Sequence, residues 1–399
     1  MARLATLDPS DRVYSDFLLK PLSSTMRPTS EAVMPVGGGE LTSFSMATSA
    51  PSYTAMQFFP ISSNRIRKGG NLVNDGSGAY FNVLNTASSG LSTTSYEIGF
   101  HHYGRKLAFH GYAYGNMDLK IICDNKHVAT RKWLHTPLST PHEFFAVMEF
   151  DYVKAREFRI LLGQIGTVQV VTEQNEAVWP SASRPIWLLT GDSYGHGAGD
   201  TTEGGITAGA FAGCLAMKTG WDVRNYCIGG TGLQNPGAGS GSSKYGSPAR
   251  KAAYAAAANL AGMIVVGPAN DGSIGTYTVA NGRAEMTSLA TALKAGRPRV
   301  PLLWLGVESG VYPSIAADLN TLNSGLKAEA AANPQLFTKY VDCRQGTRGM
   351  WVDGTGQLDN WQGNGNADIF VSSDDVHPTH AGWEYQTDLF IADIQDVLV

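Results

Sequence analysis

The pattern of hydrophobic and polar positions differs between the two halves of the chain. Between about residue 95 and residue 171, short alternating or β-rich runs predominate, and no segment has a helical period. These runs cover residues 96–100, 106–112, 118–123, 144–150, 156–162 and 167–171. The turn sequence Asp124-Asn125-Lys126 follows the third run and predicts a hairpin. Strands at this spacing predict a β-sandwich of the jelly-roll type.

After Pro180 the pattern becomes an alternation of strands and helices. Apolar runs predict strands at 186–190, 222–228, 263–267, 300–307 and 337–342. Ala-rich stretches predict helices near 206–219, 248–261, 279–295 and 314–332, and a last helix covers about 380–398. This alternation is typical of an α/β fold with a parallel sheet covered on both faces. In such folds the reactive groups collect at the carboxyl ends of the strands.

The length of 399 residues and the change of pattern predict two domains after an N-terminal arm. Residues 1–60 are rich in Ser, Thr, Pro and Met with little periodicity, which predicts an irregular arm. We expect the β-sandwich over 61–180, as an accessory or glycan-binding domain. The α/β domain is expected over 181–399.

Ser193 and the pair Asp374 and His377 are the strongest candidates for chemistry. A serine hydroxyl becomes a useful nucleophile when an imidazole takes its proton and a carboxylate fixes that imidazole. Gly191-Asp192-Ser193-Tyr194-Gly195 follows the first α/β strand and also fits the G-x-S-x-G elbow of α/β-hydrolases. In those enzymes several strands precede the serine, and the acid and the histidine lie on separate loops. Here the two lie three residues apart near the end of the chain.

Four ordered segments resemble the blocks of the SGNH (GDSL-type) hydrolase family. Gly191-Asp192-Ser193 matches the first block, and Asp374-x-x-His377 matches the last. Within 225–231, Gly230 resembles the oxyanion-hole glycine of the family, and the adjacent Gly229 competes with it. Asn270 in Gly267-Pro-Ala-Asn270-Asp271 resembles the asparagine of the third block, although that segment carries one extra residue. The resemblance covers roughly residues 184 to 399.

This resemblance implies a flavodoxin-like three-layer fold and a division of roles. Ser193 is the expected nucleophile, His377 the base and Asp374 the group that orients it. The backbone N–H groups of Ser193 and Gly230 and the side-chain amide of Asn270 are the expected donors to the oxyanion. No metal and no cofactor is implied. A β-sandwich before such a domain is similar to family 2 carbohydrate esterases.

Several further residues have competing interpretations. Asp375 competes with Asp374, and the D-x-x-H spacing favours Asp374. His196 follows the nucleophile by three residues, where a glycine-rich loop often carries a solvated histidine. His101 and His102 would point to opposite faces of a strand, which argues against a metal site. Two long excursions, 232–246 and 344–373, are expected to shape the pocket. The second contains Trp351 and Trp361, which suit sugar rings and equally suit the edge of a core.

Composition excludes some classes of partner. Charged residues are 16% of the chain and the formal net charge is −4, with no basic stripe, which argues against nucleic acid and anionic membranes. The four cysteines lack C-x-x-C spacing and are expected as reduced, buried thiols: Cys123, Cys214, Cys227 and Cys343. The first residues lack the apolar core of a secretion signal, and no long apolar run occurs. We expect a soluble protein, cytoplasmic or virion-associated.

The expected function is that of a serine esterase acting on an acylated carbohydrate, with removal of O-acetyl groups as the most concrete form. The chain also looks similar to SGNH hydrolases encoded by bacteriophages and their hosts, which suggests a virion-borne deacetylase of a surface polysaccharide. One alternative is a lipase or thioesterase of small acyl esters. Another is a non-catalytic glycan-binding virion protein. The glycan, the acyl group, the substrate-binding residues and any homo-oligomer stay open.

Overall fold

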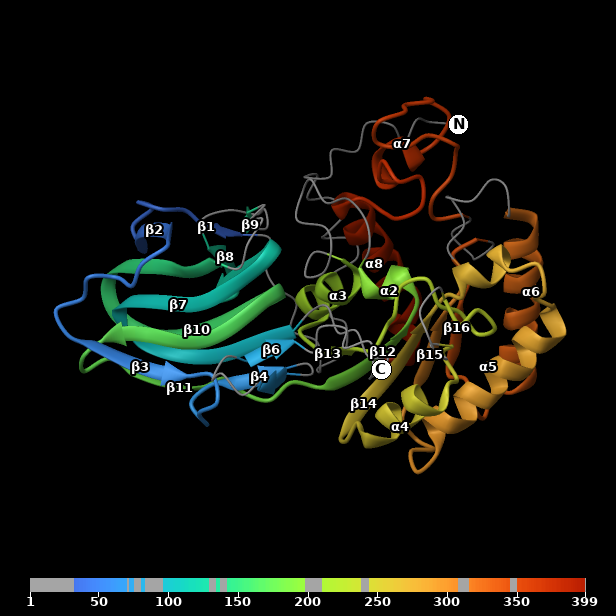
Figure 1. Ribbon diagram of the computed structural model, residues 1–399, viewed down its shortest axis with the longest axis horizontal. Coiled ribbons are helices and arrows are strands. Elements are labelled where there is room, and N and C mark those ends of the chain that lie inside the picture. The colour runs from blue at the N-terminus through green and yellow to red at the C-terminus, as the bar shows by residue number, and fades with distance from the viewer. Residues whose placement is uncertain are drawn as a thin grey trace.

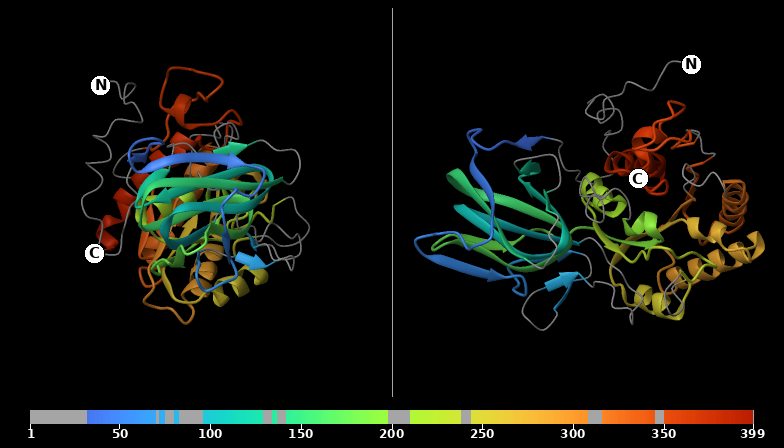
Figure 2. Two further views of the ribbon diagram at one scale, coloured as in Figure 1. Left: turned by 90° about the vertical axis from the view of Figure 1, so that its left-hand side faces the viewer. Right: turned by 45° about the horizontal axis from the view of Figure 1, so that its top comes forward.

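The computed structural model describes residues 32–69, 72–74, 80–82, 96–128, 134–136, 142–197, 210–237, 244–307, 316–344 and 350–398. A sheet of eleven strands comes from the first half of the chain, and a sheet of five comes from the second half. Figures 1 and 2 show the two parts side by side along the long axis of the molecule. Each part has a hydrophobic core, and the core of the second part also takes in Ile122 and Leu161 of the first.

Two long antiparallel strands, β7 (Tyr96–Cys123) and β10 (His142–Glu173), organise the first part. All six runs predicted as strands lie within them. The predicted hairpin is confirmed, because Cys123 pairs with Lys126 and the two residues between them have positive φ, 48° and 63°. The shorter strands are β1 (Val33–Met34), β2 (Leu41–Ala47), β3 (Met56–Pro60), β4 (Arg67–Gly69), β5 (Leu72–Asn74), β6 (Tyr80–Asn82), β8 (Lys126–Val128), β9 (Leu134–Thr136) and β11 (Ala177–Pro180).

Two features of this part differ from the sequence prediction. Hydrogen bonds join all eleven described strands into one sheet, so the two-sheet jelly roll is not confirmed and stays a prediction. The segment expected to be irregular contains β2 and β3, which both pair with β10. Only the first residue of β2, Leu41, is fully buried, so its sequence lacks the apolar alternation that identifies a strand. The start of the expected arm, residues 1–31, lies outside the described residues.

The second part is the predicted α/β fold. Its five parallel strands run in the order β13-β12-β14-β15-β16, which is the 2-1-3-4-5 order of flavodoxin-like folds. Their bounds are β12 (Ile186–Gly191), β13 (Asp222–Asn225), β14 (Leu260–Val266), β15 (Leu302–Leu305) and β16 (Lys339–Val341). Nearly every residue of β12, β14 and β15 is buried, as expected where helices cover both faces of a sheet. The parallel sheet predicted from the alternation is therefore confirmed.

The longer helices of this part lie where the sequence predicts them, whereas the two four-residue helices, at 193–196 and 367–370, were not predicted. The helices are α2 (Ser193–His196), α3 (Phe211–Thr219), α4 (Pro248–Ala256), α5 (Val279–Lys294), α6 (Ala316–Ala332), α7 (Ala367–Phe370) and α8 (His380–Ile394), with 3₁₀ turns η1 (Ala269–Ser273) and η2 (Gln395–Val397). Helices α3 and α8 pack together, and α5 contacts both α4 and α6. Figure 1 shows α2 at the upper end of β12, where the first block begins.

A buried ion cluster joins the two parts of the molecule. Its centre is Glu97 on β7, which is 5% exposed. Its ion-pair partners are Arg67, Arg159 and Arg184. Burial by itself raises the pKa of Glu97, but attraction to the arginines outweighs it and lowers the pKa to about 2. Arg159 and Arg184 also donate to the carbonyls of Ala216 and Gly220 at the end of α3, at 2.9 Å and 3.1 Å. Two arginines that are ion-paired with Glu97 of the first part therefore cap a helix of the second part.

Candidate active site

Ser193 begins the short helix α2, immediately after β12. The side chain of Asp192 caps this helix by accepting the N–H of Tyr194 at 3.0 Å. The other carboxylate oxygen of Asp192 accepts the N–H of Ala269 at 2.8 Å, on the turn that follows β14. Burial raises the pKa of Asp192, and these hydrogen bonds oppose that shift. Asp192 thus fixes the serine turn against the neighbouring strand end.

Asp374 and His377 form a close pair at the far end of the chain. Nδ1 of His377 lies 2.6 Å from Oδ2 of Asp374, and the backbone N–H of His377 donates to Oδ1 at 2.8 Å. Ser372 also donates its hydroxyl to Oδ1, at 2.7 Å. Partial burial alone raises the pKa of Asp374, but the hydrogen bonds from His377 and Ser372 outweigh it and hold the pKa well below its usual range. Between the competing aspartates, Asp374 is therefore the one in contact with His377.

Tyr194 brings the serine turn and the histidine segment together. Its hydroxyl donates to the carbonyl of Val376 at 2.7 Å, and its ring centroid lies 5.6 Å from that of His377. Nε2 of His377 is buried and has no hydrogen-bond partner among the described residues. Tyr194 therefore keeps the segments of Ser193 and His377 next to each other, but no hydrogen bond joins the side chains of Ser193 and His377. Catalytic hydrogen bonds are often long until substrate binds.

The turn after β13 lies beside Ser193. A Cβ atom built on Gly229 would lie 3.8 Å from Cβ of Ser193 and 3.6 Å from Nδ1 of His196. Gly230 has a φ of 73°, which favours glycine, and a Cβ built there would meet nothing within 4 Å. Within the described structure, the backbone N–H of neither glycine donates a hydrogen bond. Gly229 is adjacent to the serine and Gly230 faces open space, so the choice between the two stays open.

Asn270 lies on η1 and contacts the same turn. Its side-chain Nδ2 donates to the carbonyl of Thr231 at 3.0 Å, which uses one of the two amide protons. The next residue, Asp271, accepts the N–H groups of Gln234 and Asn235 at 3.0 Å and 2.9 Å. Burial raises the pKa of Asp271 to about 6. Hydrogen bonds therefore join the turn after the second sequence block to the third block, and Asn270 makes one of them.

A buried arginine beneath these turns was not predicted from the sequence. Arg250 on α4 is fully buried and donates hydrogen bonds to groups on or after β12 and β13. It lies four residues before Tyr254 on the helix, so both side chains share one face. This pair, in an otherwise Ala-rich amphipathic stretch, was the available signal. An arginine on the inward face of a helix needs acceptors in the interior.

The remaining histidines and tryptophans divide between buried and exposed positions. His196 is partly exposed, and burial together with the nearby charge of His377 lowers its pKa to about 4. His102 pairs with Glu176 at 2.9 Å, whereas His101 stacks on Trp179. Trp351 is 1% exposed, as expected of a core residue, whereas Trp361 is 66% exposed and its contact with sugar stays a prediction.

All four cysteines are free and buried, as predicted. Among the described residues, no three His, Cys, Asp or Glu side chains gather to hold a metal ion. None of the described helices is long and apolar enough to cross a membrane.

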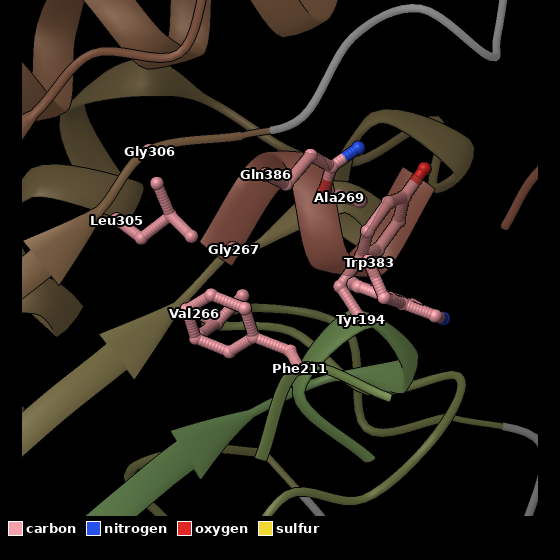
Figure 3. A pocket seen from close by; sticks show the side chains of 9 residues that line it. All are labelled: Tyr194, Phe211, Val266, Gly267, Ala269, Leu305, Gly306, Trp383 and Gln386. Atoms are coloured by element: carbon pink, nitrogen blue, oxygen red, sulfur yellow. The ribbon is translucent and has the colours of Figure 1, made fainter. Parts of the chain in front are cut away.

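A small cavity lies behind Tyr194 and is shown in Figure 3. Its volume is about 10 Å³, which is room for roughly one water molecule. Its walls come from α2, α3, α8 and the ends of β14 and β15, and its lining residues are Tyr194, Phe211, Val266, Gly267, Ala269, Leu305, Gly306, Trp383 and Gln386. This cavity cannot hold an acyl chain.

Residues 350–373, which we call the polar loop, lead directly into the Asp374–His377 segment. The carboxylate of Asp368 accepts the N–H groups of Gln362 and Gly363, both at 2.7 Å. The N–H of Leu358 donates to the carbonyl of Val371 at 2.9 Å. The polar loop is thus held by its own polar groups, and it carries the exposed Trp361. Figure 1 shows it projecting above α8.

Comparison with solved structures places this fold among known hydrolases and acyl-transfer enzymes. A family 2 carbohydrate esterase from Clostridium thermocellum, solved with cellohexaose, has a TM-score of 0.56 at 12% identity over 84% of this chain and 99% of that chain. An acetyl xylan esterase from Butyrivibrio proteoclasticus has a TM-score of 0.55 at 13% identity over 86% of this chain and 99% of that chain. The salicylyl acyltransferase of a tetracycline biosynthetic pathway has a TM-score of 0.60 at 14% identity over 86% of this chain and 97% of that chain.

The resemblance to SGNH hydrolases and family 2 carbohydrate esterases is therefore confirmed at the level of the fold. The similarity extends over nearly the whole length of these structures and includes both parts of this chain. No protein-family model and no curated protein matches the sequence.

Proposed function

We propose that the chain is a serine esterase that removes O-acetyl groups from a carbohydrate. The observation that carries the proposal is the contact of Asp374 with Nδ1 of His377, which leaves the buried Nε2 without a partner among the described residues. A carboxylate on Nδ1 fixes the tautomer in which Nε2 can accept a proton. Ser193, at the start of α2, is the proposed proton donor and nucleophile.

In the proposed reaction, Oγ of Ser193 attacks the acetyl carbonyl carbon as its proton passes to Nε2 of His377. The negative charge on the carbonyl oxygen is stabilised by the N–H of Ser193, the N–H of Gly230 or Gly229, and the free amide proton of Asn270. Collapse of the tetrahedral intermediate releases the sugar hydroxyl, which takes the proton back from His377. Water then attacks the acetyl-enzyme by the same route and releases acetate.

The carbohydrate specificity is supported by the names of the neighbours and by the polar loop. Two of the compared structures are carbohydrate esterases, and one of these is named for acetyl xylan. The exposed ring of Trp361 stands on a loop that leads into the catalytic histidine segment. These features favour a small acyl group on a polar substrate over a lipid or thioester. We also propose that 181–399 is the catalytic domain and 61–180 an accessory domain.

The test is acetate release by the purified chain from p-nitrophenyl acetate and from an acetylated xylan. Ser193→Ala is expected to lower kcat by roughly 10⁴-fold or more, with an unchanged melting temperature. A fluorophosphonate probe should label the wild-type chain and leave the variant unlabelled. Ser193→Ala with wild-type turnover would remove the proposed nucleophile. Transfer of the acetyl group to an added alcohol without free acetate would instead indicate an acyltransferase.

A further inference from the structure

The arginine beneath the strand ends has a role that the proposed mechanism does not include. We propose that Arg250 is a positioning residue of this site. In this role it fixes the backbone that presents Ser193 and the turn that presents Gly229 and Gly230, without touching the substrate. The inference rests on the proposed function, because it assigns Arg250 to the same serine site.

The hydrogen bonds of Arg250 reach two of the segments that form the site. Nη2 donates to the carbonyl of Gly191 at 3.0 Å, two residues before Ser193. The same nitrogen donates to the carbonyl of Tyr226 at 3.1 Å, on the chain that leaves β13. Nη1 donates to Oγ1 of Thr231 at 3.1 Å, directly after the glycine pair. One planar group therefore spaces the serine turn relative to the glycine turn.

Two tyrosines hold the guanidinium and extend its reach to the third segment. Nε of Arg250 donates to the hydroxyl of Tyr254 at 2.7 Å, and that hydroxyl lies 2.7 Å from Oγ1 of Thr190 on β12. The guanidinium carbon lies 5.0 Å from the centroid of the Tyr245 ring. Tyr245 in turn donates its hydroxyl to the carbonyl of Val266 at 2.9 Å, at the end of β14. The strands that precede Ser193, the glycine pair and Asn270 are thus joined through one buried centre.

The chemistry of these contacts requires arginine. A guanidinium has five donors in a planar fork, whereas a lysine ammonium has three donors at one point. Lysine at this position cannot reach the carbonyl of Gly191 and Oγ1 of Thr231 together. The first turn of α4 is also preset, since Ser247 caps the helix and Pro248 follows it. The fork is therefore delivered from a rigid element, as a preorganised site requires.

Small displacements of the donors have large effects on a reaction of this type. An oxyanion hole acts only if its donors already point at the place where charge develops. Misplacement by about 1 Å can cost roughly 10²-fold in rate. Loss of the Arg250 fork is therefore expected to act mainly on kcat, because the groups that it positions act in the transition state.

The test compares Arg250→Lys with Arg297→Lys in the full chain. Arg297 is a matched control, because it also hydrogen-bonds α4, donating to the carbonyls of Tyr254 and Ala255 at the opposite end of the helix. We expect Arg250→Lys to lower kcat for p-nitrophenyl acetate at least tenfold with KM within about threefold, and to slow fluorophosphonate labelling by a similar factor. Arg297→Lys should lower the melting temperature and leave kcat within about twofold of wild type.

A milder variant keeps the test decisive if Arg250→Lys does not fold. Thr231→Val keeps the shape of the side chain and removes the hydroxyl that accepts from Nη1. It should lower kcat severalfold with little change in melting temperature. Unchanged kcat and labelling in Arg250→Lys, or in Thr231→Val where Arg250→Lys does not fold, would overturn the inference, whatever happens to stability. If the Ser193→Ala chain still turns over ester or is still labelled, the proposed function fails instead, so the two failures give different results.

Discussion

At the scale of single residues, Asp374 and Asp375 are chemically the same but make different contacts. Asp374 accepts hydrogen bonds from the ring and the backbone of His377. Asp375 has a positive φ of 59°, and burial and the charge of Asp374 raise its pKa. The two carboxylates are adjacent in the chain, but only one of them can orient the imidazole.

Substitution of these two aspartates should therefore separate orientation from local charge. Asp374→Asn is expected to lower kcat by roughly 10³–10⁴-fold, because an amide can stabilise the wrong tautomer of His377 and cannot balance its charge. Asp375→Asn removes the same formal charge one residue away and should leave kcat within about threefold. Steady-state kinetics on p-nitrophenyl acetate measures both. Equal losses in the two variants would show that the contact seen in the structure is not the one used in catalysis.

The sequence could predict this part of the site because the residues carry the chemistry themselves. A serine after a strand and the D-x-x-H spacing are visible without coordinates. The position of Gly229 beside Ser193 and the partial burial of His196 were not predictable, because they depend on how separate strand ends meet. Arg250 was hidden for the same reason. Its acceptors are backbone and hydroxyl groups that no sequence motif marks.

At the scale of elements, the polar loop is the segment whose order depends most on side-chain hydrogen bonds. Asp368 accepts two backbone N–H groups, and a Cβ on Gly356 would collide with its carboxylate. The close packing of the polar loop therefore depends on the charged acceptor Asp368 and on the absence of a side chain at Gly356. Because the loop continues into Asp374, its order and the position of the histidine segment are connected.

Removal of this acceptor should loosen the loop more than it weakens the fold. Asp368→Ala leaves the N–H groups of the exposed residues Gln362 and Gly363 to water instead of a fixed carboxylate. We expect faster hydrogen exchange over 350–373 and a higher KM for acetylated xylan. The change in KM for p-nitrophenyl acetate should be smaller. Asp359→Ala, at a site on the same loop where no such contact is seen, is the control. Unchanged exchange in Asp368→Ala would contradict this account.

The elements themselves were predictable where burial imposes a period. All five parallel strands lie at the predicted runs, because a strand buried on both faces is apolar throughout. Strands β2 and β3 were not predicted, because most of their residues are exposed and only their pairing with β10 makes them strands. Pairing along an edge leaves almost no trace in composition.

At the scale of the whole molecule, the Glu97 cluster is the charged link between the two parts, beside the apolar contacts of Ile122 and Leu161. Glu97→Gln leaves three arginines near a neutral amide, and breaking a buried pair in this way costs roughly 3–5 kcal/mol. The pKa of Glu97 is lowered to about 2 in the folded chain, below its usual value of 4.5. The stability that it contributes is therefore present above about pH 4.5 and is lost as the pH falls towards 2.

Urea unfolding at pH 7 and at pH 3 measures both effects. The variant should be much less stable than wild type at pH 7, and the difference should shrink at pH 3. Glu149→Gln, whose partner Arg105 lies 3.9 Å away at the surface, should differ from wild type by less than about 1 kcal/mol. An equal difference at both pH values would mean that Glu97 is not the titrating group.

The link between Tyr194 and Val376 has a consequence for a chain cut between them. The hydroxyl of Tyr194 donates to the carbonyl of Val376 at 2.7 Å, although the two residues lie far apart in the sequence. Cleavage between these segments would leave the proposed nucleophile on one fragment and its proposed base on the other. Ester hydrolysis would then return only when the two fragments reassociate.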